Sequence, residues 1–149
     1  MWNDIRRTPM MVLIAFMTIA FGAEWSSAAA ENMKIRIKIK ETDVIVALAD
    51  NPSSRDLVAL LPLRLSLEDY GDVEKIGYLP RKLSTEGAPA GSTPSAGELS
   101  YYAPWGNLAF FRKDFRHSPG LIRLGTIESG MEAIYATGPV EALMERVGR

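Results

Sequence analysis

The strictest pattern in this chain is the alternation from Met33 to Lys40, which reads Met-Lys-Ile-Arg-Ile-Lys-Ile-Lys. Apolar side chains occupy every odd position and cations every even one, so one face of a strand must be buried and the other hydrated. The cations could form an anion-binding stripe. A solvated face that discourages promiscuous strand pairing is the simpler interpretation. A folded region that begins in this way is committed to a β-sheet.

Further short apolar or alternating stretches follow, and turn residues separate them. They predict strands at residues 44–49, 63–68, 74–79 and 121–127, of which the first forms a hairpin with residues 33–40. A sheet of this size loses its exposed edges most economically by closing on itself. The sequence therefore predicts a mainly β protein, a closed β-barrel with one or two short helices.

The first short helix is expected directly after residue 50. Asn51 or Ser53 can cap it, and Pro52 is tolerated in its first turn. Pro62 should end it. One apolar stripe at helical spacing would pack on the sheet, formed by Leu57, Leu60 and Leu61.

A second short helix is expected near residue 130. Ser129 and Glu132 have the spacing of a capping box, and the helix would continue through Ile134 until Gly138-Pro139 breaks it. The last stretch, residues 140–147, is ambiguous. Its Glu, Ala, Leu and Met residues favour a helix, whereas its length suits a final strand.

The N-terminus has the features of an export signal. Arg6 and Arg7 precede a compact apolar block at residues 10–23, and small residues that a signal peptidase can cleave after follow at 26–30. The block is shorter than the roughly 20 residues that span a bilayer, although an uncleaved anchor is the alternative. We therefore predict a signal peptide at 1–30, one domain at 31–149, and a periplasmic or secreted location.

Composition excludes several kinds of chemistry. The chain has no cysteine, which rules out disulfides, thiolate catalysis and cysteine-bound metals. His117 is the only histidine and no metal-ligand spacing surrounds it, so neither a metal nor a cofactor is predicted. The formal net charge of −1 lacks the basic excess of a nucleic-acid-binding protein. No membrane contact beyond export is expected, and the oligomeric state stays open.

The densest aromatic run lies between Gly97 and Lys113 and predicts two strands joined by a Pro-Trp-Gly-Asn turn. Neighbouring residues of a strand point to opposite faces, so only one ring of each adjacent pair can enter the core. The other should line a binding surface. Trp105, in the turn, could line a groove or cap the core. The candidate ligand-binding aromatics are Tyr101, Tyr102, Trp105 and Phe111.

A basic pair precedes a long loop. Arg81 is the fifth candidate, because Arg81 and Lys82 could bind a carboxylate or phosphate, although a surface pair without a partner is the simpler interpretation. Residues 84–97 are small, polar and rich in Pro and Gly. They predict a surface loop that serves either as a binding or lid element or as a simple excursion.

Several of these segments resemble the cyclophilin-like family, and in particular its small uncharacterised bacterial and archaeal barrels. The similar segments are residues 78–83, 97–100, 101–111, 124–125 and 128–132. The resemblance implies a closed cyclophilin-like barrel whose C-terminal segment returns as a strand beside the first one. For that reason we expect residues 140–147 to form a strand.

The resemblance to true prolyl isomerases is looser. Gly97-Glu98-Leu99-Ser100 matches the start of one of their motifs, but Ala109 stands where their glutamine precedes two phenylalanines. Their Phe-His-Arg run is absent and no histidine matches. Isomerisation needs a donor that stabilises the amide against a barrier of about 18–20 kcal/mol. Only Arg81 or Arg112 could supply one, from another direction.

These observations predict an exported barrel that binds a small ligand or peptide in an aromatic groove, with no catalytic residues assigned. The alternative is a divergent periplasmic peptidyl-prolyl cis-trans isomerase. A third possibility is an accessory domain that docks on an exported partner through the same surface.

Overall fold

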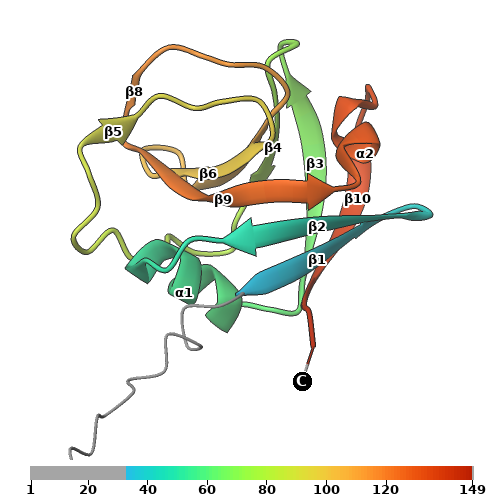
Figure 1. The fold of residues 1–149 in the computed structure, drawn as a ribbon, viewed down its shortest axis with the longest axis horizontal. Coiled ribbons are helices and arrows are strands. Elements are labelled where there is room, and N and C mark those ends of the chain that lie inside the picture. The colour runs from blue at the N-terminus through green and yellow to red at the C-terminus, as the bar shows by residue number, and fades with distance from the viewer. Residues whose placement is uncertain (1–32, 149) are drawn as a thin grey trace, which may run out of the picture.

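The computed structural model describes residues 33–148, so the predicted signal peptide at 1–30 lies outside the described residues (Figure 1). Within residues 33–148, no helix combines the length and apolar composition needed to cross a bilayer. The strands and helices are β1 (Lys34–Ile39), β2 (Thr42–Leu48), α1 (Pro52–Ala59), β3 (Leu63–Tyr70), β4 (Glu74–Tyr78), β5 (Gly91–Ser92), β6 (Glu98–Tyr102), β7 (Asn107–Phe111), β8 (Ser118–Pro119), β9 (Leu121–Ser129), α2 (Met131–Tyr135) and β10 (Val140–Arg146).

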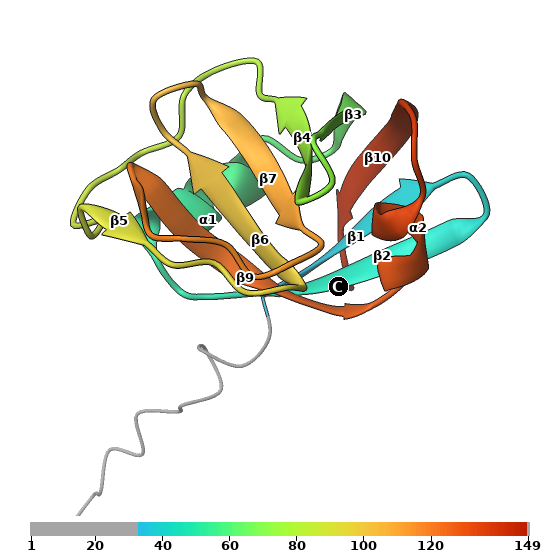
Figure 2. The same ribbon diagram turned by 90° about the horizontal axis from the view of Figure 1, so that it is seen from above.

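Eight of these strands close into a barrel in the order β1-β10-β3-β4-β7-β6-β9-β2, and every neighbouring pair is antiparallel. Seen from above, β6 and β7 run side by side, with β4 and β9 flanking them (Figure 2). The prediction of a mainly β, closed barrel with two short helices is confirmed.

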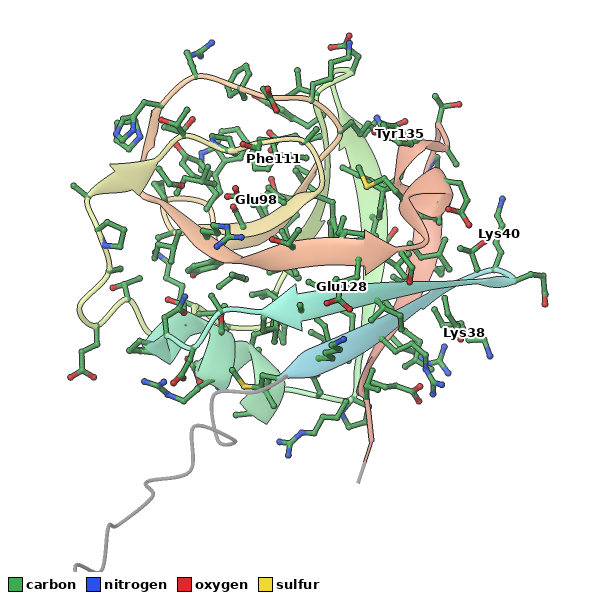
Figure 3. The ribbon with its side chains drawn as sticks, in the orientation of Figure 1. Lys38, Lys40, Glu98, Phe111, Glu128 and Tyr135 are labelled. Atoms are coloured by element: carbon green, nitrogen blue, oxygen red, sulfur yellow. The ribbon has the colours of Figure 1, made fainter. Side chains whose placement is uncertain are left out.

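The alternating first strand has one dry and one wet face. Ile35 and Ile37 are fully buried in the barrel, while Lys38 and Lys40 project from the hairpin into solvent (Figure 3). Arg36 is also exposed and pairs with Glu145 on β10 at 2.8 Å. The cations of β1 therefore form the solvated face that the pattern predicts.

The C-terminal segment is a strand, as expected from its place beside the first one. β10 lies between β1 and β3, and Val140, Ala142 and Met144 point into the core. Its residues favour a helix in isolation. Pairing on both sides and burial of one face outweigh that preference, because helix propensity differs by less than about 1 kcal/mol per residue.

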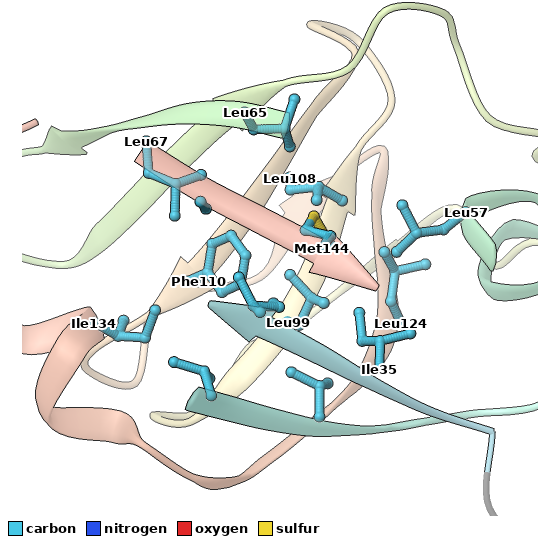
Figure 4. Packing of buried hydrophobic residues seen from close by; sticks show 14 of the residues in the cluster. Ile35, Leu57, Leu65, Leu67, Leu99, Leu108, Phe110, Leu124, Ile134 and Met144 are labelled. Atoms are coloured by element: carbon cyan, nitrogen blue, oxygen red, sulfur yellow. The ribbon is translucent and has the colours of Figure 1, made fainter. Parts of the chain in front are cut away.

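The two short helices close the two ends of the barrel. Leu57 of α1 and Ile134 of α2 are fully buried and lie at opposite ends of one core cluster (Figure 4). Asn51 is the N-cap of α1, since its side-chain oxygen accepts a hydrogen bond from the Ser54 backbone N–H at 2.8 Å.

The predicted capping box of α2 is wrong. Ser129 is the last residue of β9, and the N-cap is Gly130, which has no side chain to accept a hydrogen bond. Gly130 has a φ of 82°, and a Cβ there would lie 2.5 Å from the Asp43 carbonyl oxygen. The backbone of β2 therefore passes so close that this corner accepts glycine only.

The long polar segment 84–97 runs over the surface, as predicted. It contains β5, which pairs with β8 in a small separate sheet. The chain around β8 thereby returns over the outer face of the barrel, next to β6 and β7, and creates the candidate site.

Candidate functional site

The aromatic ribbon β6–β7 has two faces with different surroundings. Phe110 and Tyr101 are completely buried inside the barrel. Phe111 and Tyr102 point the other way and belong to a second, smaller apolar cluster outside it. The predicted division of each adjacent pair between two faces is therefore observed.

The outer face of this ribbon carries a cavity of about 420 Å³. Its floor comes from β4, β7 and β6, and the segment that leads into β8 covers part of it. In Figure 3, Phe111 lies among β4 and β6 on this side, well away from Tyr135 on α2 and Lys40 in the first hairpin. This volume is within the usual range for small-molecule sites.

Aromatic rings form the walls of the cavity. Trp105 packs edge to face against two tyrosines, with ring centroids 5.6 Å from Tyr70 and 5.4 Å from Tyr102 and interplanar angles of 78° and 74°. Phe111 and Phe115 complete the aromatic lining. Trp105 keeps 48% of its surface exposed, so it does not cap the core.

An amide group lies in this aromatic wall. Asn107 is 2% exposed and lines the cavity from β7. Its Nδ2 donates to the Leu108 carbonyl at 3.1 Å, but no donor among residues 33–148 reaches its buried Oδ1. Buried polar atoms are rarely left without a partner, and the described part of the chain does not satisfy this acceptor.

Glu74 is the acidic group of the cavity. It begins β4 and lies opposite Tyr70 on β3 and Phe111 on β7. Burial raises the pKa of the Glu74 carboxyl, because a low-polarity environment disfavours its charged form. No hydrogen bond or salt bridge joins this carboxyl to another residue of the described chain.

Two basic or titratable residues lie where the covering segment meets the cavity. The Arg116 guanidinium is 4.6 Å from the centroid of the Phe115 ring, a cation–π arrangement. His117 Nδ1 lies 3.4 Å from the Thr93 hydroxyl. Both side chains are exposed, so solvent screens their charge.

Three of the five predicted ligand-binding residues meet at this cavity, namely Tyr102, Trp105 and Phe111. Tyr101 does not, because its ring is 0% exposed in the barrel and its hydroxyl accepts a hydrogen bond from the Leu83 N–H at 3.1 Å. Arg81 does not line it either. Its guanidinium forms a bidentate pair with Asp56 of α1 at 2.8 and 2.9 Å, which lowers the pKa of the Asp56 carboxyl.

Sequence reasoning missed several lining residues. Strand alternation could have found Asn107, because it shares a face with Ala109 and Phe111 on β7. The pairing of β3 with β4 and the course of the segment around β8 were needed to find the others, among them Tyr70, Glu74, Phe115, Arg116 and His117.

A polar cluster lies at the α2 end of the barrel, where Lys75 and Arg112 are buried and the Asp69 side chain is 26% exposed. Asp69 accepts hydrogen bonds from Lys75 Nζ at 2.7 Å, from Arg112 at 2.5 Å and from the Gly138 N–H at 2.6 Å. The Lys75 ammonium, followed by the Gly138 N–H, holds the pKa of Asp69 well below its usual range. Arg112 also donates to the carbonyls of Ile134 and Ala136. This cluster fastens α2 and the start of β10 to the barrel.

Metal-ligating groups do not converge in residues 33–148, where no three His, Cys, Asp or Glu side chains lie close enough to hold an ion. The cavity instead combines apolar walls with a few polar atoms, an arrangement suited to binding an organic molecule.

Fold and cavity together define a class: a small closed antiparallel barrel with an aromatic-walled cavity on its outer face. A sequence profile of the Cyclophilin-like family matches residues 37–145, which is more than half of the chain. The chain belongs to this family, and the predicted family is confirmed.

The solution structure of a hypothetical protein from Archaeoglobus fulgidus has a TM-score of 0.59 to this chain at 16% sequence identity, covering 82% of this chain and 100% of that one. At this identity the likeness shows the fold alone, and the fold is cyclophilin-like. A search of curated proteins found no match.

Proposed function

We propose that this protein is an exported barrel that binds a small ligand or peptide in the outer aromatic cavity without catalysing a reaction. The aromatic-walled cavity of about 420 Å³ carries the proposal, because the fold leaves rings such as that of Trp105 uncovered there. A concave, mostly apolar site with a few polar groups is the usual form of a small-molecule site.

The positions of the arginines favour binding over catalysis. Prolyl isomerisation needs a donor aimed at the amide that loses its resonance. Arg112 donates hydrogen bonds to Asp69 and to two backbone carbonyls at the α2 end, and Arg81 is paired with Asp56. Neither arginine lines the cavity.

The binding proposal predicts that Trp105→Ala weakens ligand binding more than it weakens folding. The neutral fluorescent probe N-phenyl-1-naphthylamine serves as the ligand. We expect its Kd to rise at least about tenfold, which corresponds to about 1.4 kcal/mol, while the thermal midpoint moves by no more than about 2 °C. The half-exposed position of Trp105 is the reason that folding is spared.

Tyr135→Ala is the matched control, because Tyr135 is similarly exposed at 53% but lies on α2, outside the cavity. It should leave the Kd unchanged. The proposal would be contradicted if the two variants lost binding equally. It would also be contradicted if Trp105→Ala lost much stability but kept its binding. If no small probe binds, docking on a protein partner becomes the better account.

A divergent prolyl isomerase is the second candidate, and one observation favours it: Arg116 and Phe111 both line the cavity. A protease-coupled assay on an Ala-Pro peptide decides between the two. We expect no turnover above the uncatalysed rate. Turnover that disappears in both Arg116→Ala and Phe111→Ala would replace binding with catalysis.

The export part of the proposal is tested separately. The chain is expressed in a bacterium, and the N-terminus of the product in the periplasmic fraction is determined by mass spectrometry. We expect a start near Glu31, after the small residues at 26–30. An intact Met1 in the cytoplasmic fraction alone would contradict export.

A further inference from the structure

We infer that the outer cavity selects an organic cation, with an alkylated ammonium head group enclosed by the aromatic rings and facing Glu74. The inference rests on the proposed function and names the class of ligand. Three features support it: the aromatic rings that line the cavity, the unpaired carboxyl of Glu74, and the exposure of the basic residues to solvent.

Three aromatic rings meet at the cavity. Tyr70 and Tyr102 each contact Trp105 edge to face, so neither tyrosine stacks on the tryptophan. All three also line the cavity. Aromatic faces carry partial negative charge, and a cation within about 6 Å of several ring centroids is attracted to each of them.

Glu74 adds a formal negative charge beside these rings. It is the cross-strand neighbour of Tyr70, so the two residues occupy the same part of the outer face. Its raised pKa agrees with a carboxyl that has been partly removed from water with no cation supplied in exchange. A bound ammonium group would supply that cation.

Asn107 lies in the same wall. Its Oδ1 has no donor among residues 33–148 but is almost wholly covered, so the carboxyl of Glu74 is the acceptor that the cavity offers a ligand. An anionic ligand would be repelled by that carboxylate, whereas an ammonium group would be attracted to it.

The basic residues do not reverse this preference. Arg116 already rests on the Phe115 ring, which is a cation held by an aromatic group at the edge of the same cavity. Arg116 and His117 are exposed to solvent, whereas Glu74 is half-buried and Asn107 is buried. Charges in contact with water are screened, so the groups on the wall dominate.

The test compares choline with its neutral carbon isostere, 3,3-dimethylbutan-1-ol, which has the same shape without the charge. Trp105 fluorescence reports binding in the full chain carrying Trp2→Phe and Trp25→Phe, because Trp105 is then the only tryptophan. We expect choline to bind about tenfold more tightly than the isostere, in line with a cation enclosed by aromatic rings.

Three variants sharpen the result. Glu74→Gln keeps the shape of the side chain and should bring the two Kd values within about threefold. Tyr70→Leu removes one wall and should weaken choline more than the isostere. Glu41→Gln, an exposed acid in the first hairpin, is the control for long-range charge and should change neither Kd.

The outcomes separate this inference from the function on which it rests. Equal binding of choline and the isostere, or an unchanged choline preference in both Glu74→Gln and Tyr70→Leu, overturns the cation inference and leaves an apolar binding cavity. Failure of choline to bind also overturns it. Only the additional failure of N-phenyl-1-naphthylamine would remove the binding proposal itself.

Discussion

Two acidic residues on the β3–β4 hairpin, Asp69 and Glu74, lie in opposite environments. Asp69 faces the α2 end of the barrel, where a fully buried lysine, a nearly buried arginine and a backbone N–H surround it. Glu74 faces outward into the aromatic cavity and has no ionic partner within residues 33–148. The pKa of Asp69 is lowered and that of Glu74 is raised.

The contrast shows which charged groups are paired within the fold and which have no partner there. The sequence left Arg112 as a possible donor for catalysis, yet Arg112 and Lys75 both hold the segment from α2 to β10 against the barrel. Glu74 contributes no contact of that kind. A charge that is desolvated without a partner does not stabilise the folded chain, and this is why we assign Glu74 to the proposed ligand site.

The largest expected effect on stability comes from removing the charge of Asp69 from the polar cluster at the α2 end of the barrel. Asp69→Asn leaves Lys75 and Arg112 without their counter-charge, and removing one partner of a buried ion pair costs about 3 kcal/mol or more. We expect the free energy of unfolding, measured by urea denaturation, to fall by about that amount. Asp72→Asn is the control, because Asp72 lies in the same hairpin but pairs with Lys113 in full solvent. If both variants lose the same stability, Asp69 is not a structural anchor.

The second prediction concerns acid. The folded-state pKa of Asp69 lies below its ordinary value of 3.8, so the unfolded chain binds this proton more tightly than the folded one. The stability that Asp69 provides is complete above its ordinary pKa and is lost as pH falls through the folded one. The stability difference between wild type and Asp69→Asn should therefore be full at pH 7 and shrink below about pH 4. Urea titrations from pH 7 to pH 2 measure it, and a difference that stays constant would contradict this.

The smallest effect should have the opposite sign. Because the folded-state pKa of Glu74 is raised, ionising this carboxyl costs stability as pH rises above its ordinary value of 4.5. Glu74→Gln removes that cost and should stabilise the protein slightly at pH 7, by about 0.5 kcal/mol, and not at all at pH 3. The same urea titrations serve here. A clear loss of stability at pH 7 would show that Glu74 has a partner in the fold and is not reserved for a ligand.

Much of the architecture could be predicted from local patterns. The alternation at residues 33–40 fixed the faces of β1, and the adjacency of Phe110 and Phe111 fixed the division of the aromatic ribbon. The capping box at Ser129 failed because the close passage of the β2 backbone, which no local pattern reveals, requires Gly130 at that corner.

The candidate site was predicted less well, for a physical reason. Tyr101 and Tyr102 are equivalent in sequence, and only the closure of the barrel decides that Tyr101 is the buried one. Arg81 looked unpaired until the chain brought Asp56 of α1 next to it. Glu74 and Tyr70 join Trp105 only because β3 pairs with β4 and β4 with β7.

The sequence by itself determined that this protein is a mainly β barrel with an aromatic ribbon whose neighbouring rings diverge, since period-two alternation acts within a single strand. Tertiary structure alone decided which rings meet. It also decided that Asp69 is paired with two cations, whereas Glu74 is left unpaired. Those outcomes depend on contacts between residues far apart in the chain, and only the order of strands in the closed barrel sets such contacts.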